Sequence, residues 1–269
     1  MTPIHALRVL GAVAGREVEK FVHQGGRFFS ALVRPLLWLV VFAAGFQNVF
    51  GVSIIPPYET YIPYQVYIAP GLLGMVLLFN GMQSSLAMVY DREMGMMRLL
   101  LTAPVPRPWL LFAKLVAGTL LSVLQAYAFL AVAFLVGVEL PWAGLWTVLP
   151  ALVLAGLMLG SLGLLLSVNI KQLENFAGTM NFVIFPMFFI SPALYPLWKL
   201  EESGAAWLHT AAQFNPFSHA VELIRFALYG KFEPVACAVV AATLAVCFAL
   251  AVVGYDPQRG LLKKSGRPG

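Results

Sequence analysis

"YDREMGMMRLLLTAPVPRPW", residues 90–109, places five charged residues and three prolines between two long apolar stretches. Charges and helix-breaking residues are costly inside a bilayer, so this segment marks a point where the chain lies outside the membrane. The chain around it has 269 residues, of which 60% are hydrophobic and only 11% are charged, with a mean hydropathy of +0.83. Soluble domains carry about 25% charged residues, so this composition predicts an all-α integral membrane protein.

Outward from this segment, six apolar runs reach about the 20 residues that a membrane-spanning helix needs. We expect one transmembrane domain over residues 1–269, with an interfacial helix at 1–33, a six-span core at 34–254 and a tail at 255–269. The six predicted spans are residues 34–53, 66–89, 109–137, 145–167, 176–195 and 234–254.

The segment before the first span is amphipathic. Its apolar residues recur at helical spacing, whereas basic residues such as Arg8, Arg16 and Lys20 fall largely on another face. This pattern is typical of a helix that lies in the membrane interface with its basic residues toward anionic head groups. The pair Gly25-Gly26 is expected to break or bend that helix.

Basic residues are distributed unevenly between the two sides of the predicted spans. Of the 17, only Lys199, Arg225 and Lys231 lie on the side opposite to the termini. The positive-inside rule therefore places both termini and residues 90–109 in the cytoplasm, which requires an even number of spans. The external ends of the first two spans are expected to carry an aromatic belt formed by Tyr58, Tyr61, Tyr64 and Tyr67.

No recognised catalytic or metal-binding motif is present in the sequence. It contains no G-x-x-x-x-G-K-S/T, no H-E-x-x-H and no G-x-S-x-G. His219 and Glu222 are one helical turn apart, a spacing more often found on a polar helix surface than at a metal site. The net charge of +5 lies mainly at span ends, which favours membrane orientation over nucleic-acid binding. We therefore expect no enzyme activity, metal or cofactor on this chain.

Neutral amides are the candidate path residues within the predicted spans. Two interpretations remain open, namely hydrogen bonds between helices and the lining of a translocation path. No Asp or Glu lies at the centre of a span, although ion-coupled transport usually needs an ionisable group there. A transporter without such a group would take its energy from a partner. The candidate path residues are Asn80, Gln83, Gln125 and Asn181.

The region around the fifth span is rich in proline. Each proline removes a backbone donor, so a kinked span leading into short, partly buried external helices is expected. After it, "NPFSHAVELIRFALYG" predicts a helix that begins at Asn215-Pro216 and ends at Gly230. Glu222 and Arg225 are spaced to pair across one turn of this external helix.

Two segments and the amphipathic start together resemble the permease subunit of ABC-2 type ABC exporters, a family of polysaccharide, lipo-oligosaccharide and drug exporters. "REMGMMRLLLTAPVPR", Arg92–Arg107, is similar to the family's pattern after the second span, and Asn215–Gly230 is similar to its segment before the last span. The resemblance covers nearly the whole chain, and the two segments together are fairly specific. Met96-Met97 stands where the usual pattern has a further acidic or polar residue, which alters the expected partner surface.

This resemblance implies a permease subunit that moves a glycan, lipid-linked or hydrophobic drug-like substrate outward across a prokaryotic inner cell membrane. It implies a homodimer of permease chains and two cytoplasmic ATPase subunits, which would bind ATP and Mg. It also implies a cytoplasmic coupling helix seated in a cleft of the ATPase. The residues expected to couple are Asp91, Arg92, Glu93, Met94, Gly95, Met97, Arg98 and Leu101.

The residues of this segment suit coupling on physical grounds. Met94, Met97 and Leu101 form an apolar stripe at i, i+3, i+7, while Asp91 and Glu93 complement the positive end of a helix. The alternative is a loop that is charged only to fix orientation. An ion-driven secondary transporter and a membrane assembly protein also remain open, and a response to a proton gradient or a co-purified redox partner would favour them.

Overall fold

The computed structural model describes residues 3–23, 25–46, 56–93, 105–170, 172–202 and 204–255. Within these ranges the chain forms helices joined by turns and short connections, which confirms the predicted all-α class. The helices are α1 (Pro3–His23), α2 (Gly25–Phe46), α3 (Tyr64–Glu93), α5 (Arg107–Leu135), α6 (Gly144–Asn169), α7 (Leu173–Phe189), α8 (Leu197–Glu202), α9 (Ala206–Phe214), α10 (Pro216–Leu228) and α11 (Pro234–Gly254).

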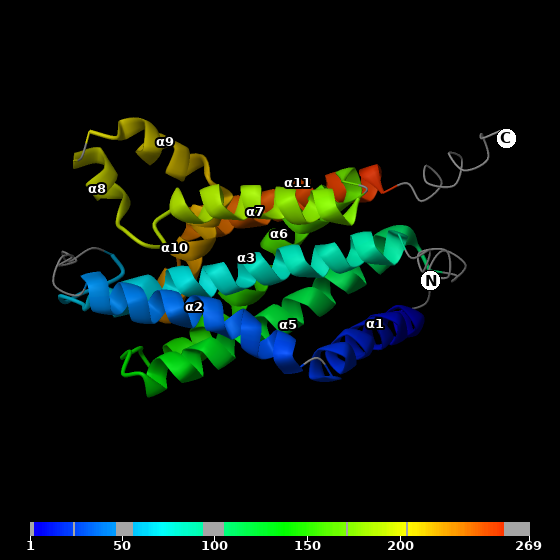
Figure 1. Ribbon diagram of the computed structural model, residues 1–269, viewed down its shortest axis with the longest axis horizontal. Coiled ribbons are helices and arrows are strands. Elements are labelled where there is room, and N and C mark those ends of the chain that lie inside the picture. Colours follow the sequence, from blue (N-terminus) through cyan, green and yellow to red (C-terminus); the bar gives the residue numbers. More distant parts are fainter. Residues whose placement is uncertain are drawn as a thin grey trace.

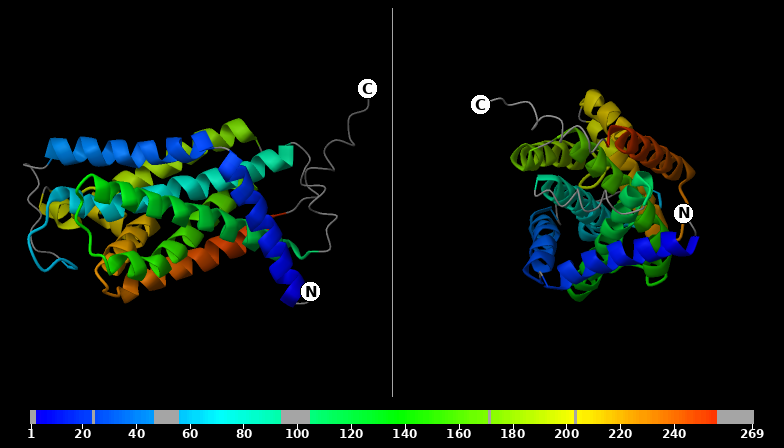
Figure 2. Two further views of the ribbon diagram at one scale, coloured as in Figure 1. Left: turned by 90° about the horizontal axis from the view of Figure 1, so that it is seen from below. Right: turned by 90° about the vertical axis from the view of Figure 1, so that its right-hand side faces the viewer.

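The long helices run side by side along the longest axis of the molecule, and successive ones alternate in direction (Figures 1 and 2). We call the end that carries residues 56–63, 136–143 and 190–233 the cap end. The opposite end, beside which α1 lies, is the α1 end (Figure 1). The start of α2 and the end of α11 both lie at the α1 end, as an even number of crossings requires.

Among the described residues, four helices are long and apolar enough to cross a membrane, namely α3, α5, α6 and α11. α7 has only 17 residues, and among the described residues of α2 the apolar stretch is only the shorter segment Leu32–Val41. The prediction of six spans is thus confirmed for four helices and stays a prediction for α2 and α7.

Two helix boundaries differ from the boundaries of the predicted spans. The first span was expected to start at residue 34, but α2 begins at Gly25, so the second part of the expected interfacial segment belongs to α2. The fifth span was expected to continue to residue 195, but α7 ends at Phe189 and residues 190–196 are not helical. A proline lacks the amide hydrogen that a helix interior needs, and Pro192 lies just beyond this end.

α3 forms the centre of the bundle. It packs against α2, α5, α6, α7 and α10. Of its most apolar 18-residue stretch 72% is buried inside the protein, compared with 22% for the corresponding stretch of α11. The backbones of α3 and α6 approach closely at Gly81. A Cβ atom there would lie only 2.9 Å from the backbone nitrogen of Gly160. Such small-residue contacts let two backbones approach, and α11 in turn covers the outer side of α6.

α1 is separate from this bundle axis and crosses it obliquely (Figure 2). It packs mainly against α5, where Trp109 Nε1 donates a hydrogen bond to Ala6 O at 3.1 Å. Ile4 and Leu7 remain 66% exposed on its other side. An exposed apolar face on a basic helix agrees with the predicted interfacial position.

Candidate functional site

Three of the four candidate path residues lie together between helices. Asn80 of α3 donates a side-chain hydrogen bond to the Gln125 side chain of α5, and Gln83 lines the same pocket as Asn80. Asn181 instead is exposed on α7. The Asn80–Gln125 bond fits the helix-joining interpretation, whereas the exposed amide of Asn181 is left without such a role.

A pocket of about 90 Å³ opens between α2 and α3 beside these amides. Arg34 of α2 lies over the ring of Phe79, with its Cζ atom 3.9 Å from the ring centroid. From the sequence, Arg34 is one of the 14 basic residues expected to orient the chain in the membrane. Its position at the start of a long apolar run was the available clue. The pocket is lined by Arg34, Pro35, Met75, Val76, Phe79, Asn80 and Gln83.

At the cap end, the non-helical segment after α7 is bonded to two other helices. Tyr64 and Tyr67 of α3 donate hydroxyl hydrogen bonds to Leu194 O at 2.7 Å and Pro192 O at 3.0 Å. These two tyrosines and Tyr58 are buried, and only Tyr61 is exposed. The predicted aromatic belt is therefore wrong for three of its four members. The hydroxyl groups of Tyr64 and Tyr67 satisfy backbone carbonyls inside the protein, and the Tyr58 ring packs against the rings of Tyr67 and Tyr229.

Asn215 joins the same segment to α10. Its Nδ2 atom donates to Met187 O at 2.7 Å and Ile190 O at 2.6 Å, carbonyl groups at the last turn of α7. Its Oδ1 atom accepts from Phe217 N at 3.0 Å, so Asn215 also caps the start of α10. The predicted helix start is confirmed, and Gly230 follows the helix with a φ of +66°.

Arg225 of α10 is only 4% exposed. Its Nη2 atom donates to Pro192 O at 2.5 Å, and its guanidinium lies 4.4 Å from the ring centroid of Tyr67. The structure contains no ion pair between Arg225 and Glu222, both of which are described, so the predicted pairing was wrong. The pKa of the Glu222 carboxyl is raised by burial, an effect that Arg225 and His219 partly oppose.

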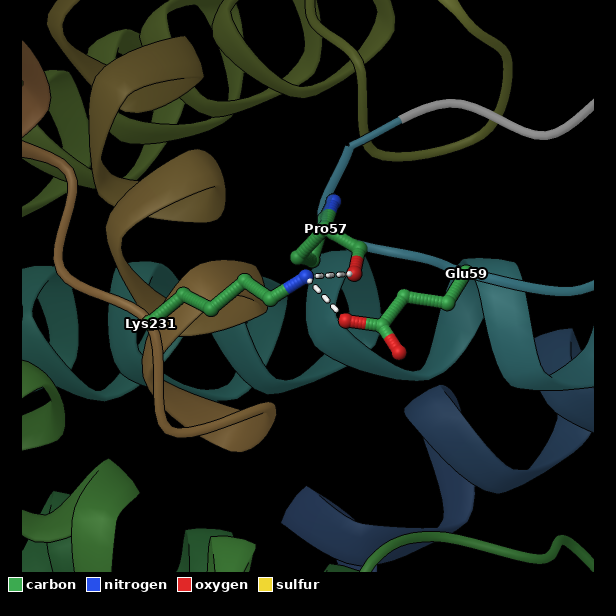
Figure 3. A network of polar contacts seen from close by, with 3 residues as sticks. All are labelled: Pro57, Glu59 and Lys231. Atoms are coloured by element: carbon green, nitrogen blue, oxygen red, sulfur yellow. Dashed lines mark hydrogen bonds and ion pairs between the residues drawn. The ribbon is translucent and has the colours of Figure 1, made fainter.

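An exposed contact closes the cap end from the outside. Lys231 Nζ donates to Glu59 Oε1 at 2.9 Å and to Pro57 O at 3.0 Å (Figure 3). The hydrogen bond and charge of Lys231 lower the pKa of the Glu59 carboxyl. This contact joins the turn after α10 to the segment before α3.

The predicted coupling segment is described only in part. Residues 91–93 belong to the last turn of α3, so Asp91 and Glu93 stand at the end of a helix and not at the positive start that was expected. Glu93 Oε1 accepts a hydrogen bond from Leu173 N at 2.9 Å, and it thereby caps the first turn of α7, whose own N-cap Gln172 provides no side-chain bond. Met94, Gly95, Met97, Arg98 and Leu101 lie outside the described residues.

No group of three or more His, Cys, Asp and Glu side chains in the described ranges is placed to hold a metal ion. His219 Nε2 contacts Gln213 O at 2.9 Å, a local contact at the α9–α10 junction. The His, Cys, Asp and Glu side chains of the described residues therefore form no such cluster. The polar features of the described structure are the amide-lined pocket between α2 and α3 and the hydrogen-bonded segment at the cap end.

Comparison with known proteins identifies the class to which this arrangement belongs. Residues 8–229 match the family described as "ABC-2 type transporter". Because this match covers most of the chain, the protein belongs to the ABC-2 type transporter family. It is a membrane transport permease and not an enzyme.

Three relatives illustrate the range of this family. "Putative transport permease ycf38" of Porphyra purpurea is 29% identical over 200 residues, which cover 73% of this chain and 66% of that protein. "Probable multidrug ABC transporter permease YbhR" of Escherichia coli K12 is 26% identical over 171 residues, covering 62% and 45%. "Daunorubicin resistance ABC transporter permease protein DrrB1" of Streptomyces coeruleorubidus is 22% identical over 217 residues, covering 80% and 73%.

Proposed function

We propose that this chain is the membrane subunit of an ATP-driven exporter that moves its substrate outward from the cytoplasm or inner leaflet of a prokaryotic inner membrane. The observation that carries this proposal is the ABC-2 family match over residues 8–229. Of the substrate classes left open by the sequence, the names of the YbhR and DrrB1 relatives favour hydrophobic, drug-like compounds over glycans and lipid-linked molecules.

The polar groups inside the bundle support an external source of energy. In α3 and α7 the acidic residues stand at the α1 end, and α2, α5, α6 and α11 contain none. Proton or sodium coupling needs ionisable groups or broken helices near the middle of the membrane, so an ion-driven mechanism fits less well. A cytoplasmic ABC ATPase, present in two copies and binding ATP and Mg, supplies the energy in this proposal.

The surface of α7 supports a homodimer of permease chains. Phe182 is 79% exposed and Phe185 is 43% exposed, with the amide of Asn181 exposed beside them. An amide is poorly placed against lipid tails. A second chain packed on α7, with α2 alongside as the family resemblance implies, would shield it or leave it facing a central path.

The contact between Glu93 and α7 provides a route for coupling. In the proposed orientation the α1 end is cytoplasmic, because most basic residues lie there. Glu93 belongs to the predicted coupling segment and bonds to the first turn of α7. A movement of the coupling segment against the ATPase would therefore be transmitted directly to α7.

The test removes the apolar stripe of the coupling segment. Met94, Met97 and Leu101 are replaced together by alanine, and the permease is co-expressed with its partner ABC ATPase. Each side chain buried at an interface contributes about 1.5–3 kcal/mol, so we expect ATPase binding to weaken by at least about 100-fold and export to stop. Membrane insertion should be unchanged.

The matched control replaces Leu120, Leu124 and Phe134 by alanine, since these α5 side chains are 51–53% exposed on the outer surface. This variant should keep both ATPase binding and export. Full export and full ATPase binding by the first variant would refute the coupling role. ATP-independent export driven by a proton gradient would refute the proposed function itself.

A further inference from the structure

The pocket between α2 and α3 holds a cation beside the middle of the long helix α3, on the exposed side of α2. Phe79, the ring beneath Arg34, lies about 20 Å from the α1 end of α3 at a rise of about 1.5 Å per residue. An arginine at such depth is costly in a membrane protein and usually has a stated partner or a function. The guanidinium lies over the Phe79 ring, with its Cζ atom 3.9 Å from the ring centroid.

Arg34 has no negative partner in the part of the chain that the structure describes. Its guanidinium lies over the ring of Phe79, and the other polar residues that line the pocket, Asn80 and Gln83, are neutral amides. Asn80 is already bonded to Gln125 through its amide group. The pocket therefore offers an unneutralised positive charge together with amide groups able to donate hydrogen bonds.

The size and surroundings of the pocket narrow the ligand class. A cavity of about 90 Å³ has room for one small acidic group, since a single water needs only about 10–15 Å³. Arg34, Leu37 and Val41 lie at i, i+3 and i+7 on one face of α2, and all three are exposed. An apolar stripe thus leads from the cation toward the cap end.

We propose that this pocket binds the phosphate or carboxylate head group of an anionic amphiphile, whose apolar part lies along Leu37 and Val41. Arg34 supplies a planar donor fork suited to two oxygen atoms, and Gln83 supplies a further amide donor. This inference deepens the proposed export function, on which its role in transport rests, by assigning the substrate an acidic head group.

The experiment measures equilibrium binding to the purified full-length chain in phosphatidylcholine nanodiscs, without ATP or ATPase. The probe is radiolabelled dodecyl phosphate, and the competitors are dodecanoate, dodecylphosphocholine and inorganic phosphate. We expect dodecanoate to compete, and the zwitterionic head group and the free anion to compete at least about tenfold more weakly. Equal competition by dodecylphosphocholine would refute the requirement for a net negative charge. Equal competition by inorganic phosphate would refute the requirement for an apolar chain.

Three variants locate the binding. Arg34→Gln should weaken dodecyl phosphate binding at least about tenfold, while Arg34→Lys, which keeps the charge, should retain most of it. Arg8→Gln removes an equal charge from an exposed position on α1 and should leave binding unchanged. Unchanged binding by Arg34→Gln, or no binding by the unmodified chain, would overturn the proposal. Because no ATP is present, failure here is separate from failure of ATP-driven export.

Discussion

Arg225 at the cap end and Arg34 in the α2–α3 pocket both lie over aromatic rings, yet their surroundings differ. Arg225 is 4% exposed, donates to Pro192 O and joins α10 to the segment after α7. Arg34 is exposed, and its described contact is the Phe79 ring alone. A buried guanidinium with a backbone acceptor holds the fold together, whereas an open one without an acceptor remains available to a ligand.

The largest effect should come from exchanging each arginine for methionine. Arg225→Met removes a charged hydrogen bond and a desolvated ring contact, so we expect a loss of about 2–4 kcal/mol in stability. Arg34→Met removes one exposed ring contact and should cost at most about 1 kcal/mol. Thermal unfolding of the two purified variants in detergent measures both. Equal losses of stability in the two variants would mean that the burial of Arg225 does not make it more important for folding than Arg34.

A smaller effect should follow from disturbing the cap end without touching any charge. A Cβ atom on Gly71 of α3 would collide with the backbone carbonyl of Ala193, so Gly71→Ala must displace the segment that Arg225 holds. Such overpacking costs about 1–3 kcal/mol. Gly178→Ala on α7 is the control, because a Cβ atom there meets nothing within 4 Å. The same unfolding assay should show no loss for this control, and equal loss in both would contradict a tightly held cap.

The smallest effect is expected from the exposed Lys231–Glu59 contact. It tests whether the contribution of a cap-end contact to folding stability depends on its burial or on its position. Lys231 lowers the pKa of the Glu59 carboxyl below its ordinary value of 4.5, so the contact stabilises the fold above about pH 4.5. This stability should be lost as the pH falls through the lowered pKa. We expect the melting temperature of the unmodified chain to exceed that of Lys231→Met slightly at pH 6, and the difference to vanish once the pH is below the lowered pKa of Glu59.

Two controls sharpen this last measurement. Glu59→Gln should abolish the pH dependence of the difference, and added salt should reduce it because exposed pairs are screened. If Lys231→Met lost as much stability as Arg225→Met, then position at the cap end, and not burial, would determine how much a contact stabilises the fold.

Part of this protein was predictable from its sequence because the relevant signals are local or averaged. Composition indicated a membrane protein, and long apolar runs located α3, α5, α6 and α11 to within a few residues. Asn215-Pro216 predicted the start of α10, since capping depends on neighbouring residues alone. The two quoted segments also pointed to the family that the comparison later identified.

Only the tertiary structure decided which partner each polar side chain takes. Tyr67 and Pro192 are 125 residues apart, and Glu93 and Leu173 are 80 apart, so no local pattern links them. The helical spacing predicted that Arg225 would pair with Glu222. Burial against α3 instead places the guanidinium beside Tyr67 and Pro192. Sequence periodicity fixes the face on which a residue lies, whereas the packing of distant helices determines what that face meets.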